Sequence, residues 1–374
     1  MKVLVNIARI LVGALFIFSG LVKAIDPLGL TYKMQEFFEV WAREGYLPSF
    51  MNMLYDFSFG LSVIMITLEV ALGVALLVGW RKKLTAVLLF LLILFFTFLT
   101  SYVLFSGKIA TCGCFGDCIP LTPVQTFTKD IALLMLIIFI LWKQKYIQPL
   151  FDNMLPLILV VLALVGTTWL QFHVVKHLPV VDCLPFKKGN DILQLRKMPA
   201  NAIQDKIDYI FIYEKDGKKQ EFNMTKLPDS TWKYVDRKEV LIAKGSNNVP
   251  VIKDFILTDS SGTDATENVL GTDKPYYLFF IKDMTEKTSK WSESFTNIWQ
   301  QANAKQRQVI IITSDTENAN KYFNITNNYN MPVYTCDVTA MKTAARANPT
   351  LFEMKGAVIV NKFSWADLNK VAVK

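Results

Sequence analysis

The sequence predicts a membrane-embedded bundle of α-helices followed by a soluble α+β region that ends in an α/β domain. Hydrophobic residues make up 52% of the 374 residues, and most of them lie before about residue 175, whereas most of the charged residues lie after it. The last third then alternates short apolar runs with helical stretches, which is the pattern of an α/β domain. The fold is therefore expected to divide into a membrane half and a soluble half.

Five apolar segments are long enough to cross a bilayer, whose hydrocarbon core requires about 20 apolar residues in a helix. They lie at roughly Leu4–Ala24, Phe57–Trp80, Leu84–Phe105, Phe127–Ile147 and Leu155–Phe172. The fourth is the weakest, because its uninterrupted apolar run is short. Lys129 and Lys143 at its ends are expected to snorkel to the interface.

Basic residues predict the orientation, because lysine and arginine concentrate in cytoplasmic loops. Lys2 and Arg9 flank the start of the first span, Arg81–Lys83 fill the turn after the second, and Lys143 and Lys145 follow the fourth. All of these lie on one side. The protein is therefore expected in a bacterial inner membrane, with its N-terminus on the cytoplasmic side.

With this orientation, the loop at 26–56, a cysteine-rich loop and everything after His173 face the periplasm. Val22–Ala24 also fits a cleavage site, so the first span is alternatively a signal peptide. Cleavage there leaves the orientation of the rest unchanged.

Three cysteines lie within seven positions between the third and fourth spans, in the sequence ATCGCFGDCIPLTP. Gly113 separates Cys112 from Cys114 and permits the turn that a disulfide between them requires. Such a strained, exposed bond is labile, which favours thiol–disulfide exchange, with Cys118 as a resolving thiol. The alternative is a structural disulfide, either within the loop or from a loop cysteine to Cys183.

A metal site is a third interpretation of the same loop. It rests on His173 and His177, the two histidines of the chain, which share a helix face at the outer end of the fifth span. Thiolate and imidazole ligands suit copper(I) or zinc, although the spacing matches no zinc template.

Exchange chemistry has its own difficulty, because the carboxylate of Asp117 disfavours a nearby thiolate. Activation of the thiol must then come from Lys108 or another group.

Glu69 lies inside the second span. An ionisable group at this depth is either paired within the bundle or takes part in proton or quinone handling. The sequence leaves both interpretations open.

The soluble half begins after Pro179 with a proline-containing linker and a small β-rich segment, in which Asp216–Gly217 predicts a hairpin. From Pro250 the expected strands and helices alternate. The strands are expected at 276–281, 309–314, 333–338 and 356–360, and the helices at 289–305, 316–323 and from about 365. Cys336 is expected to be buried in a strand. The expected domains are therefore 1–148, a fifth helix in 149–178, a linker and β-rich segment in 179–249, and an α/β domain in 250–374.

Three stretches of the membrane half resemble DoxX-like membrane proteins and, among these, the MauE branch, named for methylamine utilisation. They are ARILVGALFIFSGLVKAIDPLG at Ala8–Gly29, LEVALGVALLVGWRKK at Leu68–Lys83, and CGCFGD at Cys112–Asp117. The resemblance covers about residues 1–142. It implies a four-helix core comparable to that of vitamin K epoxide reductase, which passes electrons from thiols to quinone.

Carried over by position, the resemblance implies catalytic roles for Cys112, Cys114 and Glu69 and cofactor-binding roles for Arg9 and Lys23. Cys118 is an addition in this chain and is included among the catalytic candidates. Quinone is the cofactor that the resemblance suggests.

The pattern of 250–374 resembles a thioredoxin-like fold of the TlpA or peroxiredoxin type. Pro349 falls where that fold keeps a cis-proline, so the Asn348–Pro349 bond is expected to be cis. Lys282, Asp283, Met284 and Thr285 occupy the place of the redox cysteines, and this domain has no Cys-x-x-Cys. The resemblance therefore implies a docking module that cannot perform dithiol exchange alone.

The sequence thus supports a membrane thiol–disulfide oxidoreductase or maturation factor that acts on a periplasmic protein client. The alternatives are a non-enzymatic membrane scaffold and a metal-handling protein. Membrane lipid is an expected partner. Nucleic acid is not, because the lysines behind the net charge of +8 are scattered. The sequence does not predict the oligomeric state.

Overall fold

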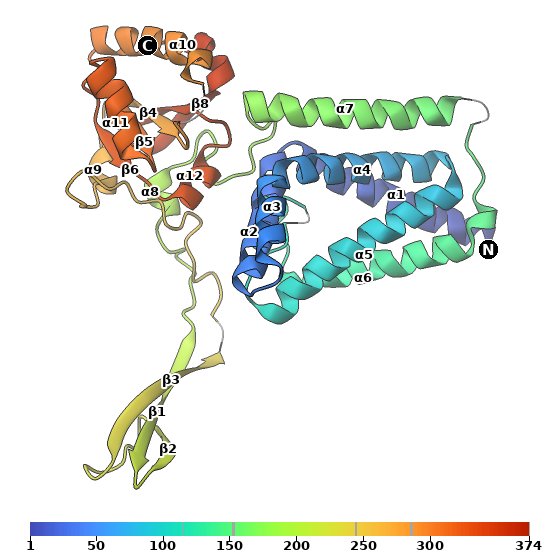
Figure 1. The fold of residues 1–374 in the computed structure, drawn as a ribbon, viewed down its shortest axis with the longest axis horizontal. Coiled ribbons are helices and arrows are strands. Elements are labelled where there is room, and N and C mark those ends of the chain that lie inside the picture. The colour runs from blue at the N-terminus through green and yellow to red at the C-terminus, as the bar shows by residue number, and fades with distance from the viewer. Residues whose placement is uncertain (114, 152–153, 244, 285–286, 374) are drawn as a thin grey trace.

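The computed structural model describes residues 1–113, 115–151, 154–243, 245–284 and 287–373. Within these ranges it contains five helices long and apolar enough to cross a membrane, as expected from the apolar segments. Figure 1 shows that these helices run alongside one another. They are α1 (Lys2–Ala24), α4 (Ser58–Val78), α5 (Lys82–Ser106), α6 (Pro123–Trp142) and α7 (Leu155–His177).

Small residues bring α1 and α4 into close contact. A Cβ atom added at Gly73 would lie 2.9 Å from the carbonyl oxygen of Gly13, and one added at Gly20 would lie 2.5 Å from Val70. Glycine at such positions lets the backbones of membrane helices approach, so that dispersion contacts hold them together.

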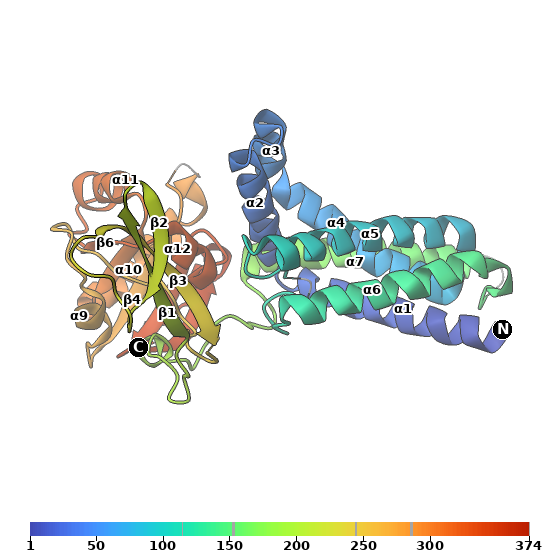
Figure 2. The same ribbon diagram turned by 90° about the horizontal axis from the view of Figure 1, so that it is seen from below.

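The expected outer loop at 26–56 is instead two helices, α2 (Pro27–Arg43) and α3 (Pro48–Asp56), at the end of the bundle nearest the soluble region (Figure 2). Pro27 and Pro48 each occupy the first turn, where proline lacks an N–H that would be unpaired anyway. The buried residues Leu30, Met34 and Phe37 of α2 recur at helical spacing. The sequence analysis missed this amphipathic pattern because α2 and α3 are too short and too polar to span a membrane.

The fourth span begins with a capping box, in which the Thr122 side chain accepts a hydrogen bond from the backbone N–H of Gln125 and the Gln125 side chain accepts one from that of Thr122. Pro123 follows the cap. This arrangement pairs backbone donors that would otherwise be exposed, and it ends the cysteine loop at a defined residue.

The soluble region contains a larger sheet with the strand order β6-β5-β4-β7-β8 across the described residues. β4 pairs in parallel with β5, and β5 with β6, whereas β7 and β8 are antiparallel to their neighbours. The strands are β4 (Pro275–Ile281), β5 (Val309–Thr313), β6 (Val333–Thr335), β7 (Thr350–Lys355) and β8 (Val358–Ser364).

Both faces of the larger sheet are buried. Leu278 and Phe280 of β4 pack on one side with residues of α12 (Val338–Ala344), and Phe279 packs on the other side with Phe295 of α10 (Ser292–Ala304). Such two-sided burial is typical of parallel strands.

The remaining helices of this region are short. They are α8 (Ile192–Leu195), α9 (Thr266–Leu270), α11 (Thr316–Asn320), the 3-10 helices η2 (Thr288–Lys290) and η4 (Trp365–Lys370), and the π-helix η3 (Lys321–Thr326). In the membrane region, the 3-10 helix η1 (Gln144–Tyr146) follows α6.

The structure differs from the expected pattern in several places. β7 and α12 were not predicted, and the last helix is the 3-10 helix η4. Part of the expected linker also belongs to the sheet domain, because Phe186 and Ile192 are in its core and Ile192 donates to the carbonyl of Ala357. The Asn348–Pro349 bond is cis, as expected.

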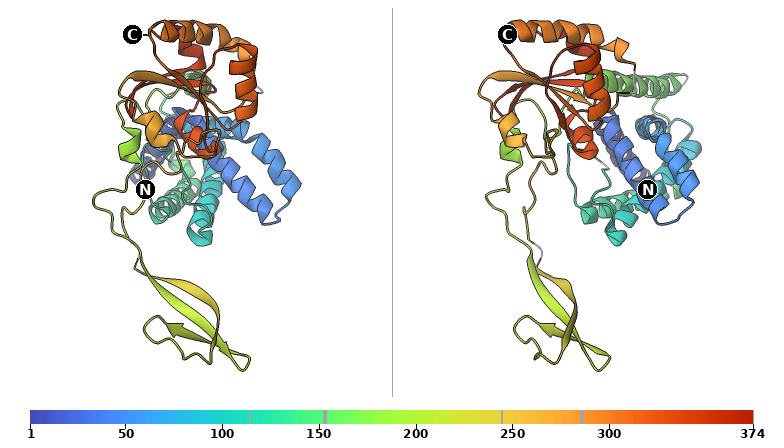
Figure 3. Two further views of the ribbon diagram at one scale, coloured as in Figure 1. Left: turned by 90° about the vertical axis from the view of Figure 1, so that its left-hand side faces the viewer. Right: turned by 60° about the vertical axis from the view of Figure 1, so that its left-hand side comes forward.

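A smaller sheet projects away from the rest of the molecule (Figures 1 and 3). Its order is β2-β1-β3, formed by β1 (Lys206–Lys215), β2 (Lys218–Asn223) and β3 (Lys233–Ala243). Asp216 and Gly217 both have positive φ, as a two-residue hairpin turn requires, so the predicted hairpin is confirmed.

Replacing Gly73 with leucine should force α1 and α4 apart. The destabilisation expected for an overpacked contact is about 1 to 3 kcal/mol. Thermal unfolding of the purified protein in detergent, followed by size-exclusion chromatography, measures it. Gly166→Leu in α7 is the matched control, because a Cβ atom there meets no atom within 4 Å. Equal losses in both variants would contradict the role given to the α1–α4 contact.

Candidate functional site

A buried ion pair connects the first two spans. The Lys23 ammonium lies 2.8 and 2.6 Å from the two carboxylate oxygens of Glu69 and 3.1 Å from the Ser19 hydroxyl. Lys23 is 2% exposed and Glu69 is 3% exposed. The interpretation of Glu69 as a group paired within the bundle is therefore correct, and its partner is a residue that the resemblance had also selected.

A second acid lies across from this pair, on α6. Asp130 is fully buried and its carboxylate is 2.6 Å from the ammonium of Lys129, while the Thr100 hydroxyl donates to it at 3.1 Å. The side chain of Lys129 turns towards Asp130, and its nitrogen lies 4.9 Å from the centre of the Phe115 ring. Its snorkelling to the interface stays a prediction.

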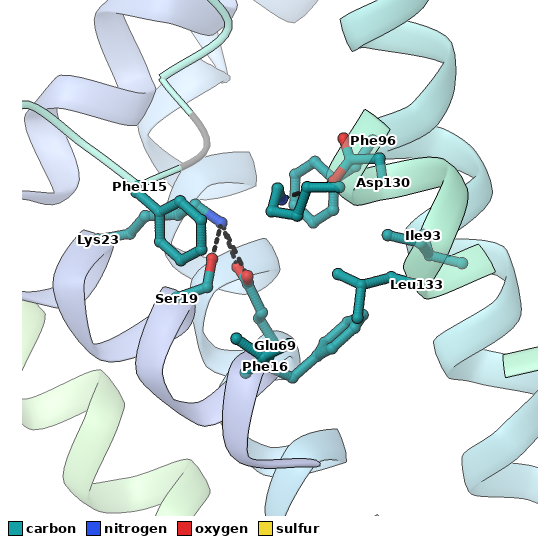
Figure 4. A pocket seen from close by; sticks show the side chains of 11 residues that line it. Phe16, Ser19, Lys23, Glu69, Ile93, Phe96, Phe115, Asp130 and Leu133 are labelled. Atoms are coloured by element: carbon teal, nitrogen blue, oxygen red, sulfur yellow. Dashed lines mark hydrogen bonds and ion pairs between the residues drawn. The ribbon is translucent and has the colours of Figure 1, made fainter. Parts of the chain in front are cut away.

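The two pairs line one cavity inside the bundle (Figure 4). Its volume of about 20 Å³ holds about one water molecule. Phe115, from the cysteine loop, is part of its wall. A quinone ring does not fit this cavity, so the arrangement suits proton or charge exchange between side chains and gives no support to a bound quinone there.

Arg9 lies apart from this centre. Its guanidinium donates to the backbone carbonyls of Leu76 and Leu77 at the C-terminal end of α4, and to that of Gln148 at 2.8 Å. A cation at the last carbonyls of a helix stabilises it. The structure thus places Arg9, expected as a cofactor ligand, where it caps a helix, and does not bring it together with Lys23 and Glu69.

The cysteine loop is bonded to the segment after α7. Cys118 and Cys183 form a disulfide with a Cα–Cα distance of 4.9 Å, which is the structural link between a loop cysteine and Cys183 that the sequence left open. Cys112 is buried, at 7% exposure, among apolar residues of the bundle, so the expectation of an exposed bond is wrong for this cysteine. Cys114 lies outside the described residues, so the expected exchange between Cys112 and Cys114 stays a prediction.

Two charges near the loop have partners that the sequence did not reveal. Lys108, considered as an activating cation, is paired with Glu44. Asp117, considered as an obstacle to a thiolate, is bound by Arg346 at 2.8 Å. The electrostatic environment of the loop is therefore set largely by residues distant in sequence.

Arg346 joins the soluble domain to the membrane region. It follows α12 and contacts the carboxylate of Asp26 at 2.9 Å as well as that of Asp117. Burial disfavours its charged form, but attraction to the two carboxylates outweighs burial and the pKa of Arg346 is raised. The guanidinium is thus a fixed positive charge between the start of α2 and the cysteine loop.

Tyr32 of α2 completes this contact. Its ring centre lies 5.4 Å from the guanidinium of Arg346, 5.1 Å from the ammonium of Lys342 and 6.0 Å from that of Lys282. Burial raises the pKa of Tyr32 to about 12, so the phenol stays neutral and its hydroxyl accepts a hydrogen bond from Lys282 at 3.3 Å. Each such cation–π contact contributes on the order of 0.5 to 2 kcal/mol, depending on its exposure.

The docked face of the domain is the one that follows β4. The backbone N–H of Lys282 donates to the side chain of Asn348, and the Asn348 amide donates to the carbonyl of Asp283. Lys282 and Asp283, expected in the place of redox cysteines, therefore lie beside the cis Asn348–Pro349 bond, and Lys282 contacts Tyr32 of α2.

The histidines take part in a different interdomain contact. His177 bonds to Asp367 of η4 at 3.0 Å, and His173 stacks on His177. Cys118 and Cys183 are committed to their disulfide. The described part of the chain contains no group of three or more His, Cys, Asp or Glu side chains that could hold a metal ion. Among the residues of the metal interpretation, His177 is thus bonded to Asp367, His173 is stacked on His177, and Cys118 is bonded to Cys183.

Cys336 is buried at 2% exposure in the core of the larger sheet domain, as expected. Its expected place within a strand is wrong, because β6 ends at Thr335. Burial raises the pKa of its thiol to about 12. A thiol of this kind is inert as a nucleophile at neutral pH.

The Lys23–Glu69 pair can be tested by a double-mutant cycle. Lys23→Met and Glu69→Met should each destabilise the bundle by about 3 to 5 kcal/mol, because each leaves one unpaired charge in an apolar environment. The double variant should recover most of this loss, since no charge remains. Thermal unfolding in detergent measures the three variants, and additive losses in the double variant would show that the two side chains act independently.

Removal of the disulfide should loosen the docked domain. The bond closes a separation of 65 residues, which corresponds to about 4 kcal/mol of chain entropy as an upper limit, because the bilayer already constrains α6 and α7. Limited proteolysis between α7 and the sheet domain should be faster than in the unaltered protein. The increase should be the same for Cys118→Ser, Cys183→Ser and the double variant. Cys336→Ala is the control. Unequal single variants would point to a further role for one of the two thiols.

Comparisons with known proteins support the MauE resemblance of the membrane half. Residues 1–143 match the family model described as Methylamine utilisation protein MauE, and residues 207–244 match one described as a Domain of unknown function (DUF8463). Protein TlpB of Flavobacterium psychrophilum is 31% identical over 138 residues, which cover 35% of this chain and 35% of that protein. The chain thus spans about a third of the length of this curated relative.

No solved structure matches the chain. The sheet domain therefore has no family assignment from these comparisons, and the smaller sheet corresponds to the domain of unknown function. The membrane half is assigned: residues 1–143 form a MauE-family membrane region, in a chain with five candidate spans.

Proposed function

We propose that this protein is a membrane thiol–disulfide exchange or maturation factor whose soluble domain is docked over its cysteine loop. The observation that carries the proposal is the contact of Arg346 with both Asp117 of the loop and Asp26 at the start of α2. Through it, a domain without a Cys-x-x-Cys motif is held against the loop that has closely spaced cysteines.

The topology of the larger sheet supports a thioredoxin-like fold for this domain. Its central strand β4 has a parallel neighbour on one side and an antiparallel one on the other, and helices cover both faces. The cis Asn348–Pro349 bond lies next to the residues that follow β4. In this proposal the end of the domain that would otherwise carry redox cysteines has become a docking face.

The proposed reaction is an exchange in which a client with two thiols reduces a Cys112–Cys114 disulfide. The client gains one disulfide, the loop gains two thiols, and two electrons and two protons move from client to loop. Glu69, beneath the loop, is the candidate for handling a proton. No step is assigned to quinone, because the cavity beside Glu69 does not accommodate its ring.

The periplasmic placement of the site is part of the proposal. The docked domain, α2 and α3 lie at one end of the bundle, and the N-terminus lies at the other (Figure 1). Arg81 follows α4 and Lys143 follows α6 at the end where Arg9 meets Gln148. Basic residues at that end favour a cytoplasmic location for it, which puts the loop in a compartment where disulfides persist.

A membrane scaffold is the second candidate. The Cys118–Cys183 disulfide favours it, because this bond has a clear structural role and removes one loop cysteine from exchange. In a scaffold, the projecting smaller sheet would present a binding surface and the loop would be inert.

Thiol trapping on the full chain in lipid nanodiscs distinguishes the two candidates. In an exchange protein, Cys112→Ser or Cys114→Ser leaves one reactive loop thiol. This thiol should attack the disulfide of an oxidised test protein, forming a mixed disulfide with one of its cysteines and releasing the other as a thiol. Cys336→Ala is the matched control and should leave exchange unchanged. If neither loop cysteine is ever trapped and the serine variants lose only stability, the exchange function is wrong and the scaffold remains.

A further inference from the structure

A polar cleft lies between the membrane region and the docked domain, with a volume of about 360 Å³. One wall is α2, where Tyr32, Lys33, Glu36 and Glu39 share a helix face opposite the buried apolar one. The other wall comes from α12 and the residues just after it. It consists of Thr339, Lys342, Thr343 and Arg346. A cleft of this size is at the lower end of the range of ligand sites, about 300 to 1,000 Å³, and is too small for a folded domain.

The charges that line the cleft cancel. Three basic residues oppose three acidic ones, which gives a net charge of zero; they are Lys33, Lys342 and Arg346, and Glu36, Glu39 and Asp117. Hydroxyl groups of Thr339, Thr343 and Tyr55 add sites that both donate and accept hydrogen bonds. Such a lining does not match a polyanion or a polycation. It matches a ligand that is neutral over its length and carries donors and acceptors in alternation, as a polypeptide backbone does.

The floor of the cleft is the cysteine loop itself. Gly113 and Gly116 both line it, and both have positive φ, a conformation that favours glycine, so neither adds a side chain to this wall. The loop is closely packed against α2, because a Cβ atom at Gly113 would lie 3.2 Å from the Cγ atom of Lys33. A chain lying in the cleft would therefore be next to Gly113, the residue between Cys112 and Cys114 in the sequence.

We infer that this cleft binds an extended segment of a client polypeptide and presents a cysteine of that segment to the loop. The inference rests on the proposed exchange function and adds the place and the chemical class of its substrate. Recognition relies on the backbone of the segment, with Tyr55 in the lining for contact with flat or apolar side chains. The segment thereby touches both the membrane region and the soluble domain.

Binding is measured by fluorescence anisotropy with the full chain in nanodiscs and a labelled short peptide whose central cysteine is blocked by iodoacetamide. Blocking separates binding from exchange. Thr343→Trp fills the cleft from α12, and Thr339→Trp does so from an exposed position one turn earlier. Each should weaken binding by about tenfold or more. Val338→Trp is the matched control, because Val338 is exposed on the same helix and does not line the cleft.

The outcomes separate this inference from the exchange function. The inference of peptide binding in the cleft is wrong if the peptide does not bind, or if it binds equally to the Thr343→Trp, Thr339→Trp and Val338→Trp proteins. Exchange with a small dithiol can be intact in either case. The inference is also wrong if the labelled peptide is displaced by a tripeptide with an unblocked cysteine but not by a longer peptide whose cysteine is blocked. Peptide binding that is lost in both cleft variants supports the inference even if the loop cysteines prove inert, in which case only the exchange function fails.

Discussion

The arrangement of the whole molecule depends on one buried guanidinium. Arg346 contacts carboxylates from two separate parts of the membrane region, Asp26 at the start of α2 and Asp117 in the cysteine loop. A buried ion is costly unless it is paired, so the docked position is the one in which all three charges are satisfied together. Undocking would require Arg346 to be rehydrated and would leave Asp26 without its partner. The contact therefore specifies one position of the domain as much as it stabilises it.

The same reasoning applies inside the bundle. Lys23 with Glu69 and Lys129 with Asp130 place four ionisable groups around a space for about one water. A bundle needs no such groups for stability, because apolar side chains of similar volume would pack as well at lower cost. Ionisable groups retained at this depth usually serve a function. Their position directly beneath Phe115 connects them to the cysteine loop, whichever reaction that loop performs.

The sequence predicted the features that depend on local pattern. The five spans followed from apolar length, the hairpin from Asp216–Gly217, and the cis bond from the resemblance around Pro349. Glu69 was identified because an acid in an apolar run is conspicuous, and the same criterion applied to Asp130 would have found it at the start of the fourth span. The partners of Lys108 and Asp117 had no local signal. Glu44 and Arg346 come from distant segments, and only the tertiary structure brings them to the loop.

The Cys118–Cys183 disulfide has a consequence for how strong the docking contact needs to be. Docking is an intramolecular event because the sheet domain and the loop belong to one chain, and the disulfide shortens the tether between them. The domain then experiences its own binding site at an effective concentration in the millimolar range or above, as for a short linker. Weak contacts that would fail between separate proteins are sufficient under this condition. Occupancy of the docked state is therefore independent of how much of the protein the cell makes, and the domain can open and close again without ever being lost.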